Sequence, residues 1–423
     1  MHPARNSWKQ LALFILGLLG FLFCVGGSAI VGLGGLLNIA SPDAITEAAQ
    51  PLALGVMFLS IGMLLAPGAL SAFRRMSGRE ESQSAAHLPF RLWHIPLLIS
   101  LWLGSLLLGQ WAAEAAPPAW ILLPLLIPLC VIPPIWLAVG LAGRGYNFNP
   151  RWRSWNAFNI GATLGPFLIL VAEMITLGIL FFIVIVFIAS QPDLFRSLEA
   201  LALRLQSAHG EEEVLAAIGP LVTSPLAIGI ILFAVSLLVP LIEEALKPLA
   251  VWFFARQLNT RLDGFALGAI SGAAYSLFET GGIGSAAGGD WLALLGARGG
   301  TSLLHIAASA WMGSAIVPAI HERKWLQLLG VYASVVALHG TWNALSVFNG
   351  FGIAAEGQPG GRWLLALAGF SAYGLAALAA LFLALLLHQQ NRFSALHNQP
   401  LAATLPGTPA ASIVEPPPTH LQT

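Results

Sequence analysis

The stretch SPLAIGIILFAVSLLVPLIEEALKPLAVWFF, residues 224–254, is almost entirely apolar and yet carries Glu243, Glu244 and Lys247. A helix needs about 20 mostly apolar residues to cross a lipid bilayer, so this stretch is long enough to span one. A charged side chain at the bilayer centre costs at least about 2.5 kcal/mol. The stretch therefore predicts a membrane-spanning helix whose charges need a functional or a structural explanation.

The composition of the whole chain agrees with this prediction. Its 423 residues are 57% hydrophobic and only 9% charged, whereas soluble domains carry roughly 25% charged residues. We expect an all-α polytopic membrane protein and exclude an ordinary soluble enzyme. The 19 basic and 19 acidic residues cancel, so no net charge points to a nucleic-acid partner. Cys24 and Cys130 lie far apart in apolar runs, which indicates neither a disulfide framework nor a four-cysteine metal site.

Ten stretches are apolar enough to span the membrane. They are residues 10–37, 51–70, 93–112, 119–142, 160–190, 224–254, 263–281, 301–320, 326–348 and 362–388. The first is too long for a cleaved signal peptide and is interpreted as a retained anchor. Of the 19 Lys and Arg residues, only Arg196, Arg204, Arg298 and Arg362 fall on the side opposite the N-terminus. Because basic loops stay in the cytoplasm, we expect about ten spans with both termini cytoplasmic.

The uneven charge of the spans predicts the domain organisation. Residues 1–220 contain about five spans with almost no charge and are interpreted as a scaffold or gating region. Residues 221–350 hold most intramembrane charges and form the expected catalytic core, followed by the last span at 351–392 and a Pro-rich disordered cytoplasmic tail at 393–423. Residues 191–220 have apolar side chains at helical spacing, which favours an amphipathic helix on the outer surface or a solvated helical loop.

Polar residues of the second half lie at similar depths in four predicted spans. At 1.5 Å per residue, Glu244, Glu279 and His339 lie about 18, 24 and 22 Å above the cytoplasmic edge, and His305 enters from the outer side. Their agreement in depth predicts that they meet. The glycine-rich segment Gly281 to Gly300, which joins two of these spans, is a candidate lid or a plain flexible connection.

Helical spacing indicates which neighbours share a face. Glu243 and Lys247 are four residues apart and can pair, whereas Glu244 is turned by about 100° toward a neighbouring sector. His339 and Asn343 are again four apart on one face. Glu173 is the one charged residue within the first five predicted spans, and we interpret its role as structural.

These residue types suit several reactions. Two histidines and a carboxylate can bind Zn²⁺ and leave a fourth position for water, and a second carboxylate can take the proton of that water. No H-E-x-x-H motif of the common zinc proteases is present. In a metal-free hydrolase, a glutamate would activate water while His and Asn stabilise the oxyanion. Ser271 lacks the first glycine of a G-x-S-G motif, so a serine mechanism is the weaker option.

The four polar segments resemble the PrsW family of intramembrane proteases, which is distantly similar to the CAAX-processing glutamate proteases. That family has E-E-x-x-K on one span, F-x-x-x-E on the next, a His-bearing span preceded by Arg, and a final H-x-x-x-N-like motif. The first motif matches at Glu243, Glu244 and Lys247, and the last matches at His339 and Asn343.

The two middle motifs match with small departures. Tyr275 stands where the family usually has Phe before Glu279, and Thr280 stands where Asn commonly follows. Arg298 and His305, with Gly313 beyond them, match the third motif. The resemblance covers about residues 225–350, and the first five spans add nothing to it.

The resemblance implies an intramembrane endopeptidase, of metallo or glutamate type, that cleaves membrane-anchored proteins such as anti-sigma-factor-like regulators in a bacterial-type inner or plasma membrane. Glu243 or Glu244 would act as general base, with the other as its partner or a metal ligand. Lys247 would neutralise the pair. The metal would be Zn²⁺, and its expected ligands, which would orient water if no metal is bound, are Glu279, His305 and His339. The expected oxyanion donors are His339 and Asn343.

Two other classes of function use the same residues. A proton-coupled transporter or lipid-handling membrane protein also needs buried Glu, His and Lys side chains. A non-catalytic scaffold would keep the fold without the reaction. The sequence leaves the substrate, the metal, the choice between the two adjacent glutamates and the oligomeric state open.

Overall fold

The structure is a computed structural model that describes residues 7–40, 44–79, 90–115, 117–144, 146, 150–355, 358 and 361–397. These residues form helices and no strand, which confirms the predicted all-α class. The helices of the N-terminal half are α1 Ser7–Leu37, η2 Asn38–Ala40, α2 Ala44–Met76, α3 His94–Glu114, η3 Pro117–Leu122, α4 Leu123–Ala142, α5 Arg151–Ala162, α6 Leu164–Ala189, α7 Pro192–Ser207 and α8 Glu211–Val222.

The C-terminal half continues with α9 Pro225–Phe233, η4 Ala234–Leu238, α10 Val239–Leu246, α11 Leu249–Phe254, η5 Ala255–Gln257, α12 Arg261–Gly284, η6 Gly288–Asp290, α13 Trp291–Glu322, α14 Trp325–Ala354 and α15 Arg362–His397. The segment η4 is a π-helix within an otherwise continuous run from α9 to α10. The predicted tail at 393–423 overlaps the end of α15 up to His397, and residues 398–423 lie outside the described residues.

Nine helical stretches of the described chain are long and apolar enough to cross a membrane, which confirms a polytopic membrane protein. Each of the ten predicted spans coincides with helical structure. The tenth is α12, which does not count among the nine because glycine, serine and Glu279 lower its hydropathy. Nearly all residues of α12 from Leu262 to Leu277 are buried by other helices. It therefore does not need the apolar surface that a lipid-facing helix requires.

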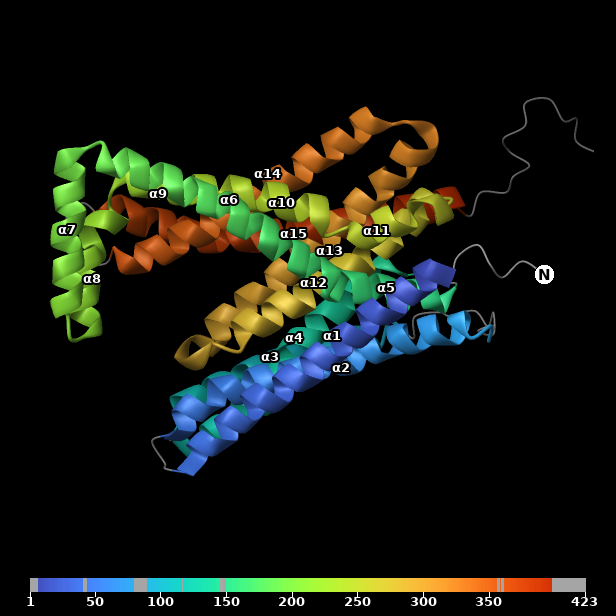
Figure 1. The fold of residues 1–423 in the computed structure, drawn as a ribbon, viewed down its shortest axis with the longest axis horizontal. Coiled ribbons are helices and arrows are strands. Elements are labelled where there is room, and N and C mark those ends of the chain that lie inside the picture. Colours follow the sequence, from blue (N-terminus) through green and yellow to red (C-terminus); the bar gives the residue numbers. More distant parts are fainter. Residues whose placement is uncertain are drawn as a thin grey trace, which may run out of the picture.

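The two most enclosed helices, α12 and α13, lie between two groups of helices (Figure 1). Helices α1–α5 pack on one side, with α4 and α5 in contact with α12, and α10, α14 and α15 lie on the other. The N-terminal half thus supports the face of α12 that points away from α10.

Helix α7 confirms the helical interpretation of residues 191–220. It crosses the ends of α6 and α9 at a steep angle (Figure 1), and none of its side chains is buried. Leu194, Leu198, Leu201 and Leu205 recur at helical spacing on one side of it. Its location on the outer membrane surface remains a prediction.

The glycine-rich segment predicted as a lid is mostly packed helix. Helix α12 continues to Gly284 and α13 already begins at Trp291, whose side chain is buried with Leu295. Only residues 285–290 join the two helices, and part of them forms η6. The lid interpretation is therefore wrong for most of the segment, because it is helical and four of its glycines lie against side chains of neighbouring residues: Gly281, Gly284, Gly299 and Gly300.

Three glycines, each four residues after the last, bring α12 against α13. A Cβ atom added to any of them would collide with the backbone of α13: at Gly264 with the carbonyl of Gly313, at Gly268 with that of Ser309 and at Gly272 with that of His305. Small residues at this spacing let membrane helices approach closely. The contact fixes the position of the α13 backbone that carries His305.

Replacement of Gly272 tests this contact. The added Cβ of Gly272→Ala would lie 2.5 Å from the His305 carbonyl oxygen, so we expect a loss of about 1–3 kcal/mol in the free energy of unfolding, as for other overpacked sites. Gly282→Ala, on the same helix with no atom near the added Cβ, is the control and should be neutral or slightly stabilising. Unfolding in sodium dodecyl sulfate measures both, and equal stability of the two variants would contradict the packing argument.

Candidate functional site

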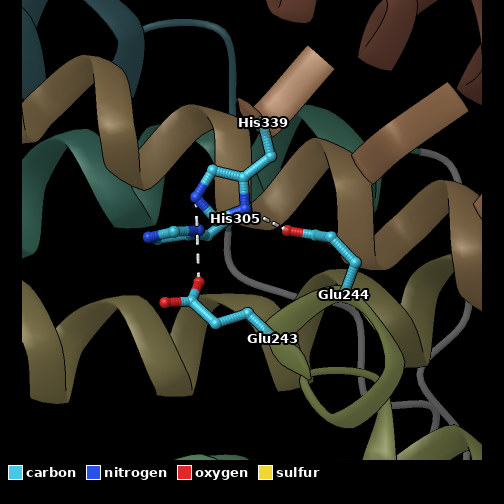
Figure 2. A group of neighbouring side chains, drawn as sticks. All are labelled: Glu243, Glu244, His305 and His339. Carbon is cyan, nitrogen blue, oxygen red and sulfur yellow. Dashed lines mark hydrogen bonds and ion pairs between the residues drawn. The ribbon is translucent and has the colours of Figure 1, made fainter. Parts of the chain in front are cut away.

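Two glutamates and two histidines converge inside the bundle (Figure 2). Glu243 and Glu244 come from α10, His305 from α13 and His339 from α14. All four are buried, and one ligand atom from each lies within 4.8 Å of the others. The convergence expected from their depths is present, and we call these four residues the Glu–His cluster.

Lys247 lies at the centre of the Glu–His cluster. Its Nζ atom is 2.6 Å from Glu243 Oε2, 2.8 Å from Glu244 Oε1 and 2.6 Å from His305 Nδ1, and its side chain is fully buried. Glu244 is turned toward a neighbouring sector of α10 but still reaches Lys247, because residues three and four apart are both neighbours on a helix. The lysine therefore pairs with both glutamates at once.

His339 contacts both glutamates from the opposite helix. Its Nδ1 lies 2.8 Å from Glu244 Oε1, and its Nε2 lies 3.8 Å from Glu243 Oε2. Figure 2 shows the imidazole reaching down from α14 toward both carboxylates. The ring therefore links the two glutamates to α14.

His305 is oriented by Glu279, which lies just outside the Glu–His cluster. His305 Nε2 is 2.7 Å from Glu279 Oε2, and the same oxygen accepts the Arg298 guanidinium at 2.8 Å. A carboxylate that accepts from one ring nitrogen fixes the tautomer and frees the other nitrogen as a ligand. Here the other nitrogen is Nδ1, which accepts from the Lys247 ammonium at 2.6 Å. The structure thus differs from the predicted ligand set, in which Glu279 bound the metal.

Asn343 is directed at the backbone of η4. Its Nδ2 atom donates to the carbonyl of Val235 at 2.8 Å. A π-helix shifts the backbone hydrogen bonds out of the α-helical pattern, and it occurs frequently at functional sites. Gly340 on the same helix allows the approach, because a Cβ there would collide with the carbonyl of Ser236. Asn343 therefore holds α14 against the segment that leads into α10, which differs from the predicted oxyanion role.

Ser271 holds the other end of α10. Its Oγ donates to the carbonyl of Lys247 at 2.6 Å, and the residue is fully buried. That carbonyl lies where α10 ends, next to Pro248, which has no N–H to continue the helix. The hydroxyl thus has a structural partner, which disfavours the serine mechanism.

Glu173 on α6 belongs to the surroundings of the site, which the sequence interpretation missed. It interacts electrostatically with Glu243, Glu279 and Lys247. Its Oε1 atom is buried without a hydrogen-bond partner. The interpretation of Glu173 as a structural residue with no charged neighbours is therefore wrong. The sequence offers one signal for this position: Glu173 is a single charged residue in an apolar span, and such a charge needs a polar partner from another helix.

The donors of the Glu–His cluster fit a zinc ion. Imidazole nitrogen and carboxylate oxygen are both common zinc ligands, and Glu244 Oε2 is buried with no hydrogen-bond partner. The site and its surroundings contain four carboxylates (residues 173, 243, 244 and 279) and two permanent cations, Lys247 and Arg298. The carboxylates outnumber these cations, which favours the binding of a divalent cation.

Comparison with known protein families gives a match. Residues 165–373 match the sequence model of a family described as PrsW family intramembrane metalloprotease. The match includes α6 with Glu173 and is longer than the region that the four motifs cover. No curated protein and no solved structure matches the chain.

Proposed function

Because residues 165–373 belong to the PrsW family of intramembrane metalloproteases, we propose that this multi-pass membrane protease hydrolyses membrane-anchored protein substrates at the Glu–His cluster. The observation that carries the proposal is the burial of two glutamates and two histidines within 4.8 Å of one another. Hydrolysis in a bilayer needs such groups, because water there must be activated in an apolar environment.

The geometry supports different roles for the two adjacent glutamates. Glu244, His305 and His339 are the proposed zinc ligands, a set of two histidines and one glutamate that leaves a position for water. Glu244 is fully buried and already contacts His339. Glu243 keeps 7% of its side chain exposed and lies next to Glu173, so it is the glutamate that water and substrate can reach. We assign Glu243 as the general base.

The other residues prepare these groups for the reaction. Glu243 takes the proton of the attacking water and then delivers it to the leaving amine. Glu279 orients the His305 ring through a hydrogen bond, and Arg298 forms an ion pair with Glu279. Lys247 forms ion pairs with both adjacent carboxylates and so offsets their mutual repulsion. When bound, zinc supplies a Lewis acid for the carbonyl and lowers the pKa of its water.

The position of the Glu–His cluster inside the bundle indicates the class of substrate. A cluster enclosed by spanning helices is reached from the bilayer, so the proposed substrates are proteins with a single membrane span, including regulators of the anti-sigma-factor type. The proposed location is a bacterial-type cell membrane with both termini of the chain in the cytoplasm. Residues 1–220 serve as the scaffold, which agrees with the packing of α4 and α5 on α12.

Metal removal tests the proposal. We expect the purified chain to contain about one zinc ion and to lose cleavage of a single-span peptide after chelation, with recovery on addition of Zn²⁺. His305→Ala should lose the metal and the activity, because it removes one of the three proposed ligands. His388→Ala, an exposed histidine on α15, is the matched control and should keep both. Elemental analysis and fragment mass spectrometry measure the two quantities. Full cleavage in the chelated protein would instead support the metal-free glutamate mechanism.

A further inference from the structure

Glu173 carries a buried acceptor atom, Oε1, that the proposed reaction does not use. Within the described residues it forms no ion pair with Lys or Arg, unlike Glu243, Glu244 and Glu279. Its Oε1 atom has no hydrogen-bond partner. An unsatisfied buried acceptor costs about 1–3 kcal/mol, and such a group in a native structure needs an explanation.

The surroundings of Glu173 place it between the site and the lipid. Its neighbours on α6 face outward: Leu170 is 57% exposed, Met174 67% and Ile175 59%. The glutamate itself is half-buried and interacts with Glu243. Helix α6 packs against α10, which carries the general base, so a substrate that approaches over α6 would meet Glu173 before Glu243.

A substrate brings the donors that this acceptor lacks. In a spanning helix every backbone N–H is bonded within the helix, so a peptide bond becomes accessible to the general base only after local unwinding. Unwinding frees backbone N–H groups in a place where water is scarce. Each of them must then find an acceptor from the protein, because an unpaired polar group in an apolar environment costs several kcal/mol.

We infer that Glu173 Oε1 binds the substrate by accepting a hydrogen bond from a backbone N–H of its unwound segment. This inference rests on the proposed function and adds α6 to the substrate-binding surface. The contact positions the strand beside Glu243, and it exists only when a peptide is bound.

The test measures peptide binding without turnover. The full chain is placed in lipid nanodiscs and its metal is removed with a chelator. The probe is a fluorescent peptide with one span of about 20 Leu and Ala residues interrupted by Gly-Gly. Glu173→Leu removes the acceptor, Glu173→Gln keeps a carbonyl oxygen, and Met174→Leu is the control on the lipid-facing side of α6.

We expect Glu173→Leu to raise the dissociation constant about tenfold, as for loss of one hydrogen bond. Glu173→Gln should stay within about threefold and Met174→Leu within about twofold, on the same scale of affinities. With zinc restored, Glu173→Leu should raise KM and leave kcat nearly unchanged. Unfolding in sodium dodecyl sulfate shows whether each variant is folded, and removal of a charge from a spanning helix does not disfavour folding.

Three results would overturn the inference: equal affinity of the wild type and Glu173→Leu, equal losses in Glu173→Leu and Glu173→Gln, or no binding of the probe to the wild type. Equal losses would mean that the charge of Glu173 matters, and not its acceptor. If binding depends on Glu173 but the zinc-loaded chain cuts no peptide, hydrolysis is refuted and the acceptor role of Glu173 stands.

Discussion

Glu243→Gln is expected to lower kcat for an anchored peptide by about 10²–10⁴-fold, the usual contribution of a general base, while the chain still binds zinc. The substitution keeps the size of the side chain but removes its ability to take a proton. The assignment depends on the greater exposure of Glu243 and on its position beside Glu173. Rapid-quench kinetics and elemental analysis of the same preparation measure the two effects.

Glu244→Gln is the matched comparison, because it makes the same change one residue further along. It is expected to weaken zinc binding, since Glu244 is the carboxylate that contacts His339 in full burial. If Glu243→Gln loses the metal and Glu244→Gln keeps it, the two roles are exchanged. If both variants keep full activity, the Glu–His cluster is not the site of hydrolysis.

Lys247→Met is expected to destabilise the metal-free protein by about 3–5 kcal/mol, the usual cost of removing one partner from a buried ion pair. The lysine side chain is fully buried and pairs with Glu243 and Glu244. Without it, two adjacent carboxylates remain in an apolar environment with no cation. Reversible unfolding in sodium dodecyl sulfate with a chelator present measures the loss.

Zinc should recover part of this stability, because a divalent cation replaces the missing charge. The gain on addition of Zn²⁺ should therefore be larger for Lys247→Met than for the wild type. Lys324→Met is the control: Lys324 pairs with Glu322 at the surface with 47% of its side chain exposed, so the effect should stay below about 1 kcal/mol. A chelated Lys247→Met protein as stable as the wild type would show that Lys247 does not neutralise the glutamates.

Much of the fold follows from local sequence. Apolar runs of about 20 residues predict spanning helices, and all ten predicted stretches are helical in the structure. Helix α12 is less apolar than the nine helices that could cross a membrane by composition alone. A helix enclosed by other helices can be rich in glycine and serine. The glycines of α12 were available as a signal, since their spacing of four residues is typical of close helix contacts.

The candidate site was predictable in its residues and less so in their roles. Glu243, Glu244, His305 and His339 follow from charge in apolar spans and from the motifs that resemble the PrsW family. The sequence also places Glu279 and Asn343 near them, but it does not tell a metal ligand from a residue that holds a ligand. That distinction depends on a few ångströms between helices.

By itself, the sequence determined that the chain crosses the membrane many times as helices, which of its residues are charged there, and that Lys247 can pair with Glu243. These properties depend on apolarity and on backbone hydrogen bonds within one helix, which are local. Only the tertiary structure decided that Lys247 contacts His305, that Glu279 orients His305, and that Glu173 reaches the site from α6. The physical reason is that contacts between helices depend on how closely the backbones pack and on how far each side chain reaches, and neither is recorded in the pattern of a single helix.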